Sequence, residues 1–210
     1  WMTSGLLLTG IVAYGIANVP ALFELFYTQV RVPGRGVILE PTLLGYAFAI
    51  PLPHALGISQ TLGAKRFEGE LRVMLAMLVL RRDGRDAARI PANEALAYCR
   101  RYGMDFFGPV ALGLCARLSD DEGERQRLND EAVVLLDAGA LGHCHIEFAA
   151  MAIESAIERG AWNEVEHYCL RLERYTCDES LPLCDFIVRR GRALAARARG
   201  EDNANAIATL

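Results

Sequence analysis

The tightest group of side chains that could hold a metal ion is His143-Cys144-His145. Imidazole nitrogens and thiolates are the ligands that zinc and copper prefer. More residues of these types follow within forty positions, namely His167, Cys169, Cys177 and Cys184. A metal-binding or enzymatic helical domain using His143, His145 and nearby cysteines is therefore one hypothesis. We favour packing roles at a helix start, because a His-x-His pair is poorly placed for one ion unless other ligands converge. We expect no metal and no cofactor.

A second candidate chemistry is acid-base catalysis by paired carboxylates. The available glutamates are Glu154, Glu158, Glu164, Glu166 and Glu173. They lie next to Arg159, Arg171 and Arg174, so we predict solvated pairs of the i, i+4 type on helix surfaces. The sequence holds no phosphate-binding loop, dinucleotide fingerprint, H-E-x-x-H or G-x-S-x-G motif. We therefore predict that this chain is not an enzyme and has no catalytic residue.

Composition describes a folded chain of one or two domains. Its 210 residues are 52% hydrophobic and 23% charged, and the net charge is −4. Nucleic acid is not an expected partner, because binding it rewards a concentrated basic patch. The six cysteines form no C-x-x-C pair, so they are expected to be reduced thiols of a cytoplasmic protein. Cys115 and Cys169 lie on apolar helix stripes, where cysteine behaves as a small hydrophobe.

The first 64 residues differ from the rest, since they carry only four charged side chains. The apolar stretch Thr3–Phe23 is long enough for a membrane span, which needs about 20 residues. Asn18 and Pro20 interrupt it and no basic cluster flanks it, so buried helices are favoured and a membrane is not an expected partner. Membrane attachment through Leu6–Phe23 remains an alternative. No basic region precedes this stretch as a signal peptide would require.

From residue 64 onward the apolar residues recur with helical spacing. The first stripe consists of Phe67, Leu71, Met74, Leu75 and Leu78. Pairs of such stripes joined by polar turns follow, with second helices expected to begin at Arg85, Glu124 and Trp162, at intervals of 39 and 38 residues. Tetratricopeptide (TPR) repeats have a period of about 34 and HEAT repeats one of about 40 to 47. The spacing predicts an all-α, TPR-like superhelix of about four to five α-α hairpins, a solenoid.

The predicted organisation follows from these intervals and from glycines that end helices. The expected segments are apolar helices at 1–63, hairpins at 64–103, 104–140 and 141–178, a final helix at 183–199 and a frayed tail at 201–210. The segment Val30–Leu39 is interpreted as a loop rather than a pair of strands. The chain begins at Trp1 with no initiator methionine, so we expect a fragment of a longer protein whose upstream part covers the apolar helices.

About half of the chain, from Tyr102 to Gly200, resembles the C-terminal helical region of bacterial multidomain class III adenylate/guanylate cyclases that carry an AAA-type ATPase module. The matching stretches are Gly103-Met104-x-Phe106-Phe107-Gly108-Pro109, Leu135 to His145, Trp162-Asn163-Glu164-Val165-Glu166-x-Tyr168, and Leu181 to Ala195. Related tails often have Gly-His-Asn-His where this chain has Gly142-His143-Cys144-His145.

This resemblance implies a role and a parent protein. The order in such proteins is a cyclase domain, an ATPase module and then a TPR-like tail, so this chain corresponds to the tail. The metal-binding aspartates of the cyclase and the phosphate loop of the ATPase have no counterparts here, and no catalytic residue carries over. The expected function is a non-catalytic scaffold for protein-protein interaction or regulation. The expected partner is a protein or peptide, including the parent's own cyclase and ATPase domains.

Overall fold

The computed structural model describes residues 27–32, 36–41, 51–179 and 181–200. The chain divides into two compact units, Trp1–Pro51 and Leu52–Leu210, and each is considered by itself. The helices predicted before residue 27, including the Leu6–Phe23 alternative for membrane attachment, lie outside the described residues. The tail predicted at 201–210 also lies outside them.

The first unit contains a β-hairpin where a loop was expected. Strands β1 (Tyr27–Val32) and β2 (Gly36–Pro41) pair antiparallel, with Val30 opposite Ile38. The loop prediction for Val30–Leu39 is therefore wrong. The helices predicted for 1–63 are likewise wrong at residues 27–32 and 36–41. β-branched residues recur along both stretches and favour extended backbone. Pairing also gives the two backbones hydrogen-bond partners that a loop would have to find in water.

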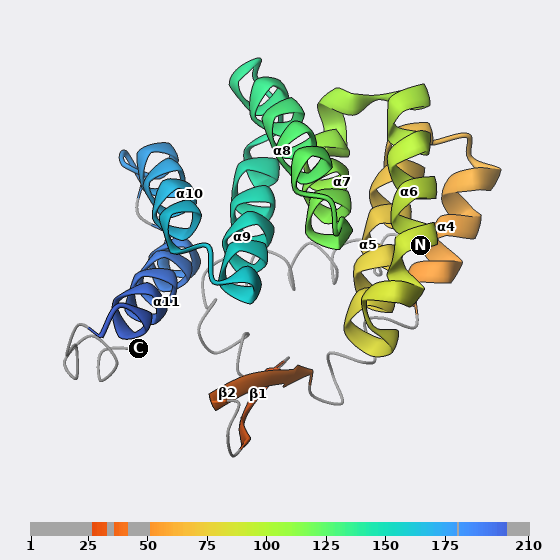
Figure 1. Ribbon diagram of the computed structural model, residues 1–210. Helices are drawn as coiled ribbons and strands as arrows, with labels where there is room; N and C mark the ends of the chain where they lie inside the picture. The colour runs from red at the N-terminus through yellow and green to blue at the C-terminus, as the bar shows by residue number, and fades with distance from the viewer. Residues whose placement is uncertain (1–26, 33–35, 42–50, 180, 201–210) are drawn as a thin grey trace. The chain divides into compact units, whose positions relative to one another are not determined.

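The second unit is helical, which confirms the all-α prediction for this part of the chain (Figure 1). Its helices are α4 (Pro51–Thr61), α5 (Lys65–Asp83), α6 (Arg85–Tyr102), α7 (Met104–Leu118), α8 (Glu122–Asp137), α9 (Gly142–Arg159), α10 (Trp162–Tyr175) and α11 (Pro182–Ala198). None of these helices combines the length and the apolar character needed to cross a bilayer.

Two helix ends show how local chemistry sets the turns. Gly160 follows α9 with φ of +70°, a left-handed conformation that costs a residue with a Cβ roughly 1 kcal/mol or more. The next N–H, of Ala161, donates to the Ala156 carbonyl at 2.9 Å and closes the helix. Helix α8 begins after Asp121, whose carboxylate accepts from the Glu124 N–H at 2.6 Å. Gly160 therefore ends α9, and Asp121 caps the start of α8.

The helices pack as hairpins that follow one another along the chain. Helix α5 packs against α6, α7 against α8, and α9 against α10. The first helix of each pair also packs against the first helix of the next, so α5 contacts α7, α7 contacts α9 and α9 contacts α11. Every residue of α7 from Phe107 to Ala116 is buried, because neighbours cover this helix from both sides. Helix α7 is the centre of the core.

Candidate functional site

The two histidines predicted as possible metal ligands lie in the first turn of α9 and face different neighbours. The His143 ring lies 5.6 Å from the Phe107 ring, whereas the His145 ring stacks on Tyr175 with centroids 4.0 Å apart and planes within 5°. Residues two apart on an α-helix are rotated by about 200°, which explains the divergence. Cys144 between them is buried, and its Sγ lies 3.1 Å from the Phe106 carbonyl oxygen. Cys144 is therefore packed in the core, whereas the two histidine rings face different aromatic neighbours.

The later histidine and cysteines do not complete a metal site. Within the described residues, no group of three or more His, Cys, Asp or Glu side chains is placed to hold a metal ion. Cys169 and Cys184 are buried, Cys177 is exposed, and all six cysteines of the chain are free thiols. Burial raises the pKa of Cys144 to about 12 and that of Cys169 to about 11, which disfavours the thiolate that metal binding and nucleophilic attack require.

The glutamates considered for acid-base catalysis are held in ion pairs with arginines. The pairs are Arg190 with Glu154, Arg117 with Glu158, Arg159 with Glu164, and Arg192 with both Glu166 and Glu173. These contacts join different helices, so the predicted i, i+4 geometry is wrong. Of the three arginines predicted as partners, Arg159 alone pairs with one of these glutamates within the described residues. Packing of successive helices brings carboxylates of one helix next to arginines of another.

One pair of carboxylates that the sequence did not single out has unusual electrostatics. Glu147 on α9 is partly buried, and this burial together with the charge of Glu70 on α5 raises the pKa of Glu147 to about 7. Burial also raises the pKa of Glu70, while the nearby His143 opposes that shift. The two glutamates are far apart in sequence and meet only because α5 and α9 both pack on α7, so no local pattern could have found them.

A row of three rings crosses the first turns of three successive first helices. Phe67 on α5 meets Phe106 on α7 edge-on at 5.5 Å, and Phe106 meets His143 on α9 at 6.3 Å. The three residues are separated by 39 and 37 positions, close to the repeat interval. Phe67 is 54% exposed and His143 is also exposed, whereas Phe106 between them is half-buried, so the two ends of the row lie at the surface. We call Phe67, Phe106 and His143 the ring row.

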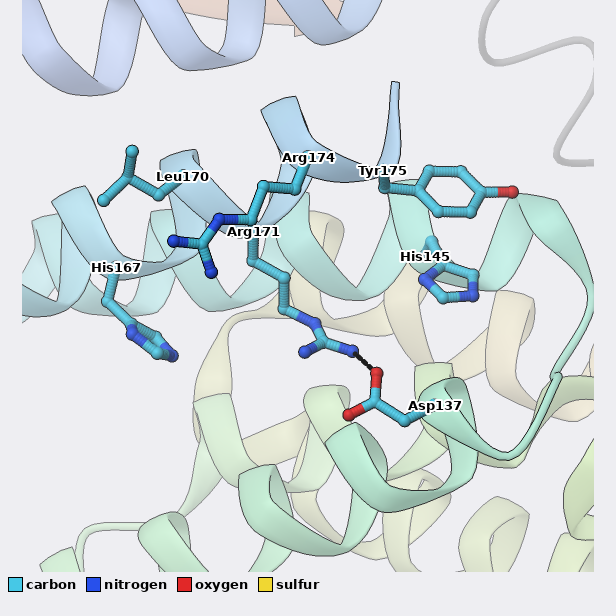
Figure 2. Close-up of a pocket in the computed structure, with 7 residues that line it drawn as sticks. All are labelled: Asp137, His145, His167, Leu170, Arg171, Arg174 and Tyr175. Atoms are coloured by element: carbon cyan, nitrogen blue, oxygen red, sulfur yellow. Dashed lines mark hydrogen bonds and ion pairs between the residues drawn. The ribbon is translucent and has the colours of Figure 1, made fainter. Parts of the chain in front are cut away.

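An open pocket of about 380 Å³ lies where α10 faces the end of α8 and the start of α9 (Figure 2). Its lining residues are Asp137, His145, His167, Leu170, Arg171, Arg174 and Tyr175, which we call the α10 groove. Figure 2 shows Arg171 reaching across to Asp137, with the His145–Tyr175 stack on one side of this ion pair and His167 on the other. The Arg171 Nη2 to Asp137 Oδ1 distance is 2.6 Å.

The α10 groove is positively charged. Asp137 neutralises Arg171, but Arg174 has no hydrogen-bond or ion-pair partner within the described part of the chain. Burial, followed by the charge of Arg171, lowers the pKa of His145, so this ring is neutral near pH 7 and serves as a flat platform against Tyr175. Arg174 therefore supplies the uncompensated charge of the groove.

Sequence reasoning named some members of the groove for other reasons and missed the rest. His145 and His167 were considered as metal ligands and Arg171 and Arg174 as ion-pair partners, while Asp137, Leu170 and Tyr175 were not named as candidate site residues. One sequence pattern could have indicated the groove. The spacing of His167, Arg171 and Arg174 places three nitrogen-bearing side chains on one face of α10.

Compared with known proteins, the chain matches no protein-family model, no curated protein and no solved structure. The two features that its own residues offer are the ring row and the α10 groove, both of which are surfaces suited to binding.

Proposed function

We propose that this chain is a TPR-like helical-repeat scaffold that binds a protein partner. The proposal is supported by hairpins that recur at 38 to 39 residues and by first helices that pack on one another in succession. Hairpins of this kind bury their apolar faces by stacking, and the stack offers an extended binding surface. The period is longer than that of a regular TPR array, so the chain would be a divergent member of that architecture.

The observation that carries the proposal is the ring row. Equivalent positions of three hairpins carry rings that contact one another, with Phe67 and His143 exposed and Phe106 half-buried between them. A large aromatic side chain that is 54% exposed gains free energy when a partner covers it, and aromatic anchors dominate many protein interfaces. A continuous row over three hairpins suits a partner that lies across the repeats.

The resemblance to cyclase-associated tails suggests which partner this is. We propose that the chain is the C-terminal part of an adenylate cyclase-like signalling protein and that the ring row docks on the parent's own cyclase or ATPase domains. Binding at the tail would then regulate the catalytic domains without any chemistry in the tail.

The test is a binding measurement between the purified chain and separately purified cyclase and ATPase domains from the same reading frame. We expect the double variant Phe67→Ser/Phe106→Ser to weaken binding at least tenfold, because it removes two aromatic contacts. Ile90→Ser is the matched control, since Ile90 is 70% exposed on α6 and lies outside the ring row. Circular dichroism would verify that each variant is folded. If the wild-type chain binds neither domain, and the double variant leaves the cyclase output of the longer protein unchanged, the scaffold proposal is wrong.

A further inference from the structure

The α10 groove combines hydrogen-bond donors with apolar side chains on one helix face. His167, Arg171 and Arg174 follow at i, i+4 and i+7, so they project from the same side of α10. Leu170 and Tyr175 also line the groove and are 40% and 42% exposed. A ligand that fills this groove must therefore offer both a negative charge and an apolar group.

The donors of the groove exceed its acceptors. Asp137 accepts one hydrogen bond from Arg171 and is the one carboxylate among the lining residues. A guanidinium has five N–H donors, so Arg171 retains donors after this bond, and those of Arg174 have no partner within the described residues. The unmatched donors favour a carboxylate ligand, because arginine binds carboxylates through short, charge-assisted hydrogen bonds.

Asp137 restricts the charge of that ligand. Its carboxylate is 63% exposed in the groove and would repel a dianion such as a phosphate group. A single carboxylate at Arg174 avoids most of this repulsion. The exposed Leu170 beside Arg174 can then be covered by an apolar neighbour of the same carboxylate, which a small free anion lacks.

We propose that the α10 groove binds a peptide segment of a partner protein, with one aspartate or glutamate carboxylate on Arg174 and an adjacent apolar side chain on Leu170. This inference rests on the proposed scaffold function and adds the chemistry of one contact to it. The stacked rings of His145 and Tyr175 line one side of the groove and offer a flat surface to the peptide backbone.

The experiment is selection of a displayed library of random dodecapeptides on the full chain, followed by affinity measurement for the enriched peptides. We expect enriched peptides to contain an acidic residue next to an apolar one. Arg174→Glu should weaken their binding at least tenfold, because it places a second negative charge where the carboxylate binds. Arg189→Glu is the matched control, since Arg189 is exposed on α11 and does not line the groove.

A second variant should change the peptide affinity in the opposite direction. Asp137→Asn removes the carboxylate that competes for Arg171, so we expect it to tighten binding about threefold or more. Enriched peptides that bind Arg174→Glu as well as wild type would overturn the groove proposal and leave the ring row untouched. Tighter binding of a phosphopeptide than of its glutamate counterpart would also overturn it. Failure to enrich any peptide would overturn the groove proposal, whereas the scaffold function is decided separately by binding of the cyclase and ATPase domains to the ring row.

Discussion

Gly113 on α7 lies directly beneath the ring of Phe148 on α9. A Cβ built at Gly113 would come within 2.9 Å of Phe148 Cδ2, closer than side-chain carbons approach in folded proteins. Phe148 is fully buried, so its ring cannot make room by turning into solvent. The contact lets the first helices of two successive hairpins approach each other closely, and it is therefore a requirement of the stacking itself.

Gly113→Ala should destabilise the chain. Overpacking a buried helix contact costs about 1 to 3 kcal/mol, which here exceeds the gain of less than about 1 kcal/mol from replacing a helical glycine. Urea denaturation followed by circular dichroism measures the difference. Gly57→Ala on α4 is the control, because nothing lies within 4 Å of a Cβ at that position and the substitution is expected to be neutral or stabilising. Equal effects of the two substitutions would contradict the packing argument.

The ion pairs of Arg192 on α11 should stabilise the packing of this last helix against α10. Its guanidinium donates to Glu166 and to Glu173, at distances from 2.6 to 3.1 Å. The three side chains are 37 to 44% exposed, so we expect Arg192→Ala to cost only about 1 kcal/mol, less at high salt. Amide hydrogen exchange should become faster in α11 and remain unchanged in α7. A double-mutant cycle with Glu173→Gln that gives no coupling energy would show that the pair is not formed in solution.

The positions of the helices could be predicted from the sequence because apolar periodicity and glycines are local signals. The stripe that begins at Phe67 and the junctions at Glu124 and Trp162 lie inside or at the start of observed helices. The β-hairpin was missed because short β-branched runs such as Val30–Val32 carry no helical or strand periodicity long enough to decide between a loop and a strand. Whether such a run forms a strand depends on a second stretch of chain that can pair with it.

The candidate site was less predictable, since its contacts join residues from different hairpins. His145 was noticed for its residue type, but its stacking partner Tyr175 is thirty positions away and belongs to another helix. The pairing of Arg171 with Asp137 is similarly remote. Rules for neighbours on one helix describe i, i+4 pairs and cannot describe pairs formed by stacking.

The thiols should differ sharply in reactivity. Cys177 is exposed, whereas the other five cysteines are buried, and burial raises the pKa of Cys99 to about 11 and of Cys115 to about 12. A thiol-exchange reagent at pH 8 should therefore modify one cysteine rapidly in the native chain and all six in urea. Cys177→Ser should remove the rapid reaction. Rapid modification of a second thiol in that variant would show that the core opens readily.

Glu147 should make the stability of the chain depend on pH. Its pKa is raised to about 7 by burial and by the charge of Glu70, whereas an unfolded chain has a glutamate pKa of about 4.3. Below about pH 4.3 both states are protonated and the contribution to stability is fully present. As the pH rises to about 7 the unfolded chain loses a proton that the folded chain retains, so this contribution is lost. The loss is on the order of 1 to 3 kcal/mol.

Urea denaturation of Glu147→Gln and wild type at pH 5, 6, 7 and 8 isolates this effect. The variant removes the ionisable group and keeps its shape, so its stability relative to wild type should increase from pH 5 to pH 7 and then level off. Glu70 and His143 are the titratable neighbours in this cluster, and both remain in the variant. Glu94→Gln, at an exposed position on α6, is the control whose difference from wild type should stay constant. A constant difference for Glu147→Gln as well would show that Glu147 ionises in the folded chain as it does in water.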